Sequence, residues 1–130
     1  MLIDNDAGAQ SVYGAIAGVT KKKKPTGSEP FIHLVGNLYV VPTPPIKGSP
    51  ITTIENFFED AVLQAVLNGK TFNPTDDKDN EKNYGKAAFA RDVVAKNAGT
   101  IDFSAFSEIL NRINLVIADY AVKKTTIAIP

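Results

Sequence analysis

The first eight residues place two aspartates and a glycine directly after a short apolar segment. Met1 to Ile3 form that segment, Asp4 and Asp6 follow it two positions apart, and Gly8 precedes a helical pattern. Successive side chains of a strand point to opposite faces, so we expect both carboxylates on one face, with Cα atoms about 6.6 Å apart. In open α/β sheets, ligands bind at this end of a strand. Because Mg²⁺ prefers a few carboxylate oxygens together with waters, the pair is a candidate Mg²⁺ site.

A structural interpretation of the same residues stays open. Asp6 can cap a helix that begins at the next residue, and Asp4 and Asn5 are common in turns. An EF-hand loop is excluded, because its sixth and twelfth positions require Gly and Glu. Counted from Asp4, these positions hold Ala9 and Ala15.

Composition limits the kind of site that this chain can hold. The 130 residues, 44% of them hydrophobic, are enough for one domain with a core of ordinary size. Cysteine is absent, which excludes thiolate metal sites and a catalytic thiol. Fourteen basic and fourteen acidic residues cancel, so any nucleic-acid site must be local. The chain has neither an apolar run of about 20 residues nor a signal peptide, and we expect a soluble, cytoplasmic protein without a membrane partner.

A basic loop follows the first predicted helix. That helix is expected over residues 7–19, where apolar residues recur at helical spacing. Residues 21–30 then contain proline and glycine, which mark a loop. Its lysine run either is a solvated linker or contacts nucleic-acid phosphates, whose charge clustered lysines neutralise without reading the base sequence. The run consists of Lys21, Lys22, Lys23 and Lys24.

A hairpin is predicted next. The apolar, β-branched runs 31–35 and 38–41 flank Gly36 and Asn37, which predicts two strands joined by a tight turn, or one strand with a bulge. His33 is the sole histidine and lies in the first run. We expect a packed or surface histidine there rather than a ligand.

Three more helices are predicted in the second half of the chain. Apolar stripes mark residues 52–67, 84–94 and 104–122, and the polar, acidic stretch 68–83 is expected to be a loop. The last helix is the longest and should serve mainly as scaffold. Its expected buried face consists of Phe106, Ile109, Leu110, Ile113, Val116, Ile117 and Tyr120.

Two charged residues near helix starts each have two interpretations. Glu55 lies in the first turn of the 52–67 helix, where an acid favours the helix dipole. Alternatively, it is a third metal carboxylate from a distant part of the chain. Lys86 lies near the N-terminal end of the 84–94 helix, where a cation is unfavourable, and this hints at an anion nearby. Most lysines at such positions are simply solvated.

The opening segment Leu-Ile-Asp-Asn-Asp resembles the DxD motif of Toprim domains, the fold shared by topoisomerases, bacterial primases and OLD-family nucleases. Further segments resemble the C-terminal extension of some retron-type reverse transcriptases, namely residues 37–44, 54–58, 68–72 and 84–90. This resemblance implies an α/β fold over residues 1–130. The fold would be a partial Toprim-like, Rossmannoid sheet with flanking helices and a helical C-terminal part.

Carried over to these residues, the resemblance implies Mg²⁺-dependent phosphodiester chemistry on DNA or RNA. Asp4 and Asp6 match the metal-binding pair of the family. Glu55 resembles the acid that OLD-type domains place at a helix start, and Lys86 resembles a lysine that such domains keep near the scissile phosphate. Metal-activated water would attack the phosphodiester while Lys86 offsets the developing charge. No Tyr-x-Asp-Asp run occurs, so polymerisation by this chain is not expected.

The sequence departs from the family pattern at two places. Toprim domains carry a glutamate after their first strand, so we expect further strands upstream of Met1 in a larger domain. Gly8 also lies one position earlier than in the DxDxxG motif of topoisomerases. We therefore expect the chain by itself to be inactive as a nuclease, and the apolar strand edge at Met1 to Asp4 to pair with another chain in an oligomer.

The same residues are consistent with three alternative functions. The first is an Mg²⁺-dependent nuclease domain that contains Asp4, Asp6, Glu55 and Lys86. The second is a module that binds nucleic acid or a reverse-transcriptase core without cutting. The third is an inactive structural remnant.

Overall fold

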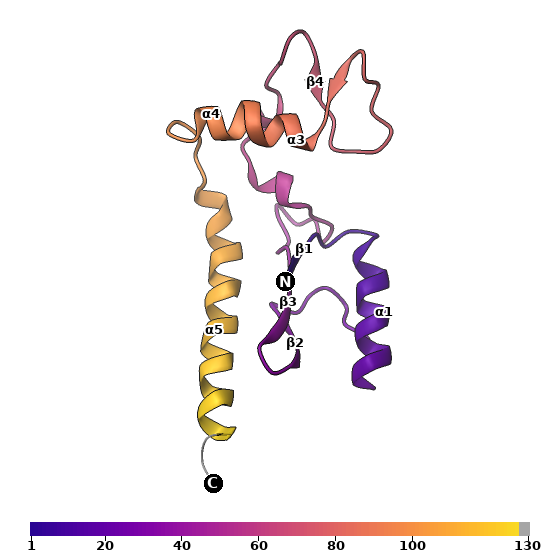
Figure 1. Ribbon diagram of the computed structural model, residues 1–130, viewed down its shortest axis with the longest axis vertical. Helices are drawn as coiled ribbons and strands as arrows, with labels where there is room; N and C mark the ends of the chain where they lie inside the picture. The colour runs from indigo at the N-terminus through magenta and orange to yellow at the C-terminus, as the bar shows by residue number, and fades with distance from the viewer. Residues whose placement is uncertain (128–130) are drawn as a thin grey trace. The chain divides into compact units, whose positions relative to one another are not determined.

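The computed structural model describes residues 1–127 and shows a mixed α/β protein with a small sheet and several helices (Figure 1). The chain forms two compact units. The first unit contains residues 1–57 and the chain from Phe106 onward, and the second contains Phe58–Ala105. None of the helices within residues 1–127 combines the length and apolar character that crossing a membrane requires.

A three-stranded sheet organises the first unit. β1 (Leu2–Ile3) pairs in parallel with β3 (Leu38–Pro42), and β3 pairs antiparallel with β2 (Ile32–Val35), which gives the order β1-β3-β2. The predicted hairpin is confirmed. Its turn begins at Gly36 with a φ of 54°, a left-handed conformation that glycine adopts without a Cβ penalty. β3 ends at Pro42, opposite the last residue of β1, Ile3, and the Thr43 N–H still donates to the Ile3 carbonyl oxygen at 2.9 Å.

The helix predicted over residues 7–19 is confirmed as α1 (Ala9–Thr20). It ends at Lys21, which has a φ of 58° and donates its N–H to the Ala17 carbonyl oxygen at 3.0 Å. One side of α1 packs against the sheet and forms the core of the first unit, which contains Ala9, Tyr13, Ile16 and Val40. The basic loop that follows contains neither helix nor strand, as predicted.

α5 (Ser107–Ile127) lies on the opposite side of the sheet from α1 (Figure 1). Side chains alternate along β3, so Val40 packs with α1 while Tyr39 reaches α5. The Tyr39 hydroxyl donates to Asp119 Oδ2 at 2.7 Å, and Lys123 Nζ donates to the same oxygen at 2.6 Å. These hydrogen bonds among Tyr39, Asp119 and Lys123 therefore hold the C-terminal half of α5 against the sheet.

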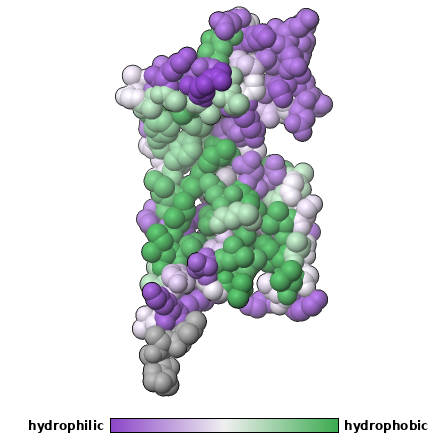
Figure 2. Space-filling view, in the orientation of Figure 1, coloured by the Kyte–Doolittle hydropathy of each residue, from purple (hydrophilic) through white to green (hydrophobic). Residues whose placement is uncertain are grey.

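The prediction for the buried face of α5 is wrong for most of its residues. Ile109 is buried and Val116 is half-buried, but the structure exposes Leu110, Ile113, Ile117 and Tyr120. Figure 2 shows apolar residues over much of α5. The side of α5 toward the sheet carries polar anchors instead, because Arg112, Asp119 and Lys123 recur at helical spacing and bind sheet groups or one another. These hydrogen bonds set the rotation of the helix.

The network also perturbs Tyr39, which gives a first testable prediction. Burial, followed by the hydrogen bond to Asp119 and its negative charge, raises the pKa of Tyr39 to about 12. A raised pKa favours the neutral phenol in the folded state, so this contribution to stability is complete below about pH 10 and is lost as the pH rises through about 12. Asp119→Asn should lower the Tyr39 pKa only partly, because burial remains.

Site-resolved NMR titration of the tyrosine rings measures this effect. Asp92→Asn is the matched control, since Asp92 belongs to the second unit and should leave the Tyr39 pKa unchanged. The same Tyr39 pKa in wild type and Asp119→Asn would contradict the proposed coupling.

The prediction of one helix over residues 52–67 is wrong. The chain instead forms the 3-10 helix η1 (Ile54–Phe57) in the first unit and the short helix α2 (Asp60–Leu63) in the second. Glu59, just before α2, is extended with a ψ of 150°. Thr52 is fully buried and pairs with Asn5 in a β-bridge. Its hydroxyl donates to the Pro44 carbonyl oxygen at 3.0 Å. These long-range bonds outweigh the helical propensity of the segment.

The second unit contains a two-stranded sheet in a stretch predicted as loop. β4 (Thr71–Phe72) pairs in parallel with β5 (Asn83–Tyr84), so residues 68–83 are loop except for these short strands. The Phe72 ring stacks on Phe89 with centroids 4.2 Å apart. The apolar cluster around this pair holds the unit together.

The helix predicted over residues 84–94 is confirmed and runs to Asn97. It consists of α3 (Lys86–Ala88), the π-helical turn η2 (Phe89–Val94) and α4 (Ala95–Asn97). Its buried residues Phe89 and Val93 join Tyr84 in the core of the second unit.

Candidate functional site

Asp4 follows β1 and holds the start of η1. Its Oδ1 accepts a hydrogen bond from the Ile54 N–H at 2.7 Å, although the two residues are 50 positions apart. Glu55 is the next residue, in the first turn of η1 as predicted, and only 8% of it is exposed. The fold therefore brings the backbone that carries Glu55 beside Asp4 at the carboxyl end of β1.

Asp6 caps α1. Its Oδ1 accepts hydrogen bonds from the Gly8 N–H at 2.9 Å and the Ala9 N–H at 3.3 Å. Asp6 thus makes hydrogen bonds of the kind expected from a cap, although α1 begins at Ala9 rather than at Ala7, and the carboxylate also meets the positive end of the helix dipole. β1 ends at Ile3 and the chain bends at Asp6. The alternation expected of a continuous strand therefore does not extend across both aspartates.

Asn5, between the two aspartates, joins four segments of the first unit. Its N–H donates to the Thr52 carbonyl oxygen at 2.8 Å and to Thr43 Oγ1 at 3.0 Å. Its side-chain Nδ2 donates to the Gly27 carbonyl oxygen at 2.8 Å, and its Oδ1 accepts from the Tyr13 hydroxyl at 2.8 Å. The sequence pattern predicts only a turn residue at Asn5 and not this role. The available signal was an amide side chain between two carboxylates.

Gly27 allows the loop after α1 to reach Asn5. Its φ is 90°, and a Cβ built at this position would lie 2.6 Å from Asn5 Oδ1. Any larger side chain would therefore push Asn5 away. This close approach explains why the breaker-rich loop returns to the end of β1.

An open cleft of about 570 Å³ lies at this end of the sheet. Asp6, Gln10 and Arg112 bring a carboxylate, an amide and a guanidinium to its lining, and residues 26–28 contribute part of the rim. Arg112 belongs to α5, for which the sequence predicted only a scaffold role. The feature of the sequence that could have identified Arg112 is that it is a single arginine within an apolar helical stripe.

Hydrogen bonds hold the charged groups around the cleft. Arg112 Nη1 donates to the Pro42 carbonyl oxygen at 2.9 Å and to the Glu29 carbonyl oxygen at 3.4 Å. Burial lowers the pKa of Arg112, whose ordinary value lies far above neutral, so the guanidinium stays charged. Burial opposes ionisation of Glu29, but N–H groups of Thr26 and Gly27 outweigh it and lower the pKa of Glu29. The site thus has fixed charges of both signs.

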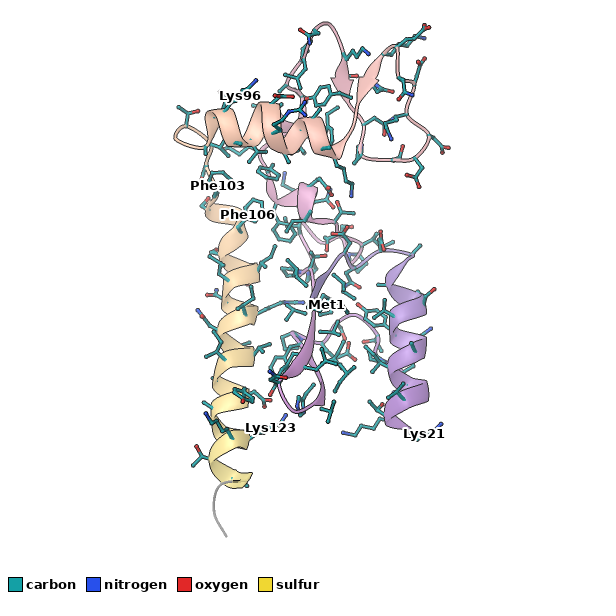
Figure 3. The ribbon with its side chains drawn as sticks, viewed as in Figure 1. Met1, Lys21, Lys96, Phe103, Phe106 and Lys123 are labelled. Atoms are coloured by element: carbon teal, nitrogen blue, oxygen red, sulfur yellow. The ribbon has the colours of Figure 1, made fainter. Side chains whose placement is uncertain are left out.

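None of the predicted phosphate-contacting lysines lines this cleft. Lys21 to Lys24 are exposed and follow the C-terminal end of α1, whereas Asp6 lies at its N-terminal end (Figure 3). A 12-residue helix is about 18 Å long. Lys86 is the first residue of α3, at a helix start as predicted. It belongs to the second unit, and the three predicted metal carboxylates belong to the first.

The donors near the cleft are oxygens, the type that Mg²⁺ prefers, and such sites usually complete their coordination with waters. Within residues 1–127, no group of three or more His, Cys, Asp or Glu side chains has an arrangement that could hold a metal ion. The carboxylate chemistry therefore consists of the Asp4 and Asp6 pair, with Glu55 on the adjoining turn. In comparisons with known proteins, the chain matches no family model and no solved structure.

Proposed function

We infer that this chain is a Toprim-like C-terminal portion of a retron-type reverse transcriptase, with Mg²⁺-dependent, nuclease-type phosphodiester chemistry on DNA or RNA. One observation carries the proposal. The parallel strand β1 leads into Asp4, Asn5 and Asp6 beside a cleft, and α1 follows directly. In open α/β sheets, ligands bind outside the carboxyl ends of the strands at such a position.

The residues at this end of the sheet carry charges that suit a metal ion and a phosphate. Asp4 and Asp6 would hold Mg²⁺, which when bound supplies charge stabilisation and a more acidic water. Arg112 lines the cleft and offers the planar donors that pair with phosphate oxygens. Asn5 positions the segment between the aspartates through its hydrogen bonds to Thr43, Thr52, Gly27 and Tyr13.

The family resemblance assigns the remaining roles. Glu55 would add an acidic group beside Asp4. The exposed lysines 21–24 would contact the nucleic-acid backbone beyond the cleft. A reverse-transcriptase core is the protein partner that the resemblance implies.

A module that binds nucleic acid without cutting it is the second candidate. The observation that favours it is the structural use of both aspartates, since Asp4 Oδ1 holds the start of η1 and Asp6 Oδ1 caps α1. Carboxylates occupied in this way stabilise the fold whether or not they bind metal.

Mg²⁺ titration tests the metal site. We expect the wild-type melting temperature to rise by a few degrees once Mg²⁺ exceeds its dissociation constant about tenfold, because a ligand that binds only the folded state stabilises it. The combined change Asp4→Asn and Asp6→Asn should abolish this rise. Asparagine still accepts the backbone hydrogen bonds that both aspartates make, so the fold should survive.

The matched control is Asp76→Asn with Asp77→Asn, which removes two carboxylates from the 68–83 loop and should preserve the rise. An equal rise in the Asp4 and Asp6 variant would place the metal elsewhere in the chain. Loss of the rise in the loop variant would point to that loop.

A further inference from the structure

A second cleft lies at the opposite end of the sheet from Asp6, between the β2–β3 turn and the last turns of α5. Its volume is about 610 Å³, which lies within the usual range of small-molecule sites. Figure 3 shows Lys123 on these last turns of α5, level with the hairpin. The lining residues are His33, Gly36 and Asn37 of the hairpin and Tyr120, Lys123, Lys124 and Thr126 of α5.

Several groups in this cleft are held in place by their neighbours. Asp119 Oδ2 accepts from both Tyr39 and Lys123, and the Lys123 ammonium lies 5.7 Å from the centroid of the Tyr39 ring. The His33 ring packs on Tyr39 with centroids 4.5 Å apart. Its Nε2 lies 2.9 Å from the Gly36 carbonyl oxygen and donates to it, because a carbonyl oxygen only accepts. Groups already ordered lose little freedom when a ligand binds.

The lining suits an aromatic ring that carries an anionic group. Lys123 and Lys124 bring two positive charges against the single negative charge of Asp119, so the cleft keeps a net positive charge. Tyr120 is 38% exposed and offers part of an aromatic ring for stacking. The aliphatic stems of the lysines form apolar walls below their charged ends. A planar base and a phosphate, the two recognisable parts of a nucleotide, match these features.

We propose that this cleft binds one nucleotide, with the base against Tyr120 and the phosphate at Lys123 and Lys124. Sequence-tolerant nucleotide binding commonly combines an aromatic platform with a basic groove. The nucleotide is either free or a unit of single-stranded nucleic acid, since both present the same base and phosphate. The site lies at the other end of β3 from Asp6 and needs no Mg²⁺.

Calorimetric titration with deoxyadenosine monophosphate, in buffer with EDTA, tests the site without metal chemistry. We expect Tyr120→Ala to weaken binding by about 5-fold or more through lost stacking. Lys124→Ala should weaken binding by a similar factor through the lost charged contact. Lys124 is exposed, so Lys124→Ala should keep the wild-type melting temperature. Tyr120 is only 38% exposed, so the melting temperature of Tyr120→Ala is recorded to show that the variant is folded during the titration. Lys47→Ala, which removes an exposed lysine outside both clefts, should bind as tightly as wild type.

A parallel titration with an oligothymidylate that carries a 5′-phosphate distinguishes the two sources of the nucleotide. Weaker binding of the monophosphate in the Tyr120 and Lys124 variants supports a site for free nucleotides. Weaker binding of the oligonucleotide alone supports a position on a nucleic-acid strand. Inorganic phosphate that binds as tightly as the monophosphate would overturn the proposal, as would unchanged binding of both ligands in the two variants or no binding of either. Because EDTA removes Mg²⁺ and both substituted residues lie outside the first cleft, these outcomes do not depend on the metal site.

Discussion

Asp6→Asn is expected to lower any Mg²⁺-dependent cleavage of nucleic acid that this chain supports by a factor of about 10²–10⁴. The substitution removes one negative charge from the cleft but keeps an oxygen that accepts from the Gly8 and Ala9 N–H groups. The loss should therefore come from metal binding rather than from unfolding of α1. Cleavage of single- and double-stranded DNA and RNA measures it, with melting temperatures recorded for each protein.

Asp76→Asn supplies the control for this assay, because that exposed carboxylate lies in the polar loop of the second unit. It should leave cleavage unchanged. Undiminished cleavage by Asp6→Asn would remove Asp6 from the metal site. A wild-type chain that cuts none of these substrates would agree with the inactivity expected of the chain by itself, and the rise in melting temperature with Mg²⁺ would then be the test of Asp6.

Gly27→Ala is expected to destabilise the protein by about 3 kcal/mol, the largest effect of a single methyl group that we expect in this chain. A residue other than glycine is strained at a φ of 90°, and the new Cβ would lie 2.6 Å from Asn5 Oδ1. Asn5 would have to move, and its hydrogen bonds to Gly27 and Tyr13 would weaken together. Chemical denaturation measures the free energy of unfolding.

Gly14→Ala provides the matched control. Gly14 lies within α1, and a Cβ there meets no atom within 4 Å. Alanine favours helix by about 1 kcal/mol over glycine, so this variant should be slightly more stable than wild type. Equal free energies of unfolding for Gly27→Ala and Gly14→Ala would show that the close approach of residue 27 to Asn5 does not affect stability.

The elements predicted correctly from sequence depend on interactions within a few residues. α1 follows from apolar residues at helical spacing, and the β2–β3 hairpin follows from two β-branched runs around Gly36. The helical run from Lys86 to Asn97 has the same origin. Asp6 as a helix cap also belongs to this class, because its hydrogen bonds reach only two and three residues ahead.

The features that only the tertiary structure decided depend on hydrogen bonds between distant residues. Asp4 and Ile54 are 50 positions apart. Their hydrogen bond and the buried Thr52 interrupt residues 52–67, for which the apolar period predicted one helix. The bond from Arg112 to Pro42 spans 70 positions, and that from Tyr39 to Asp119 spans 80. Both bonds turn α5 so that its apolar residues Leu110 and Ile117 face outward. The period of the sequence shows where apolar residues recur along a helix. The partners of buried polar groups decide which side of the helix packs on the sheet, because an unpaired buried donor or acceptor costs about 1–3 kcal/mol.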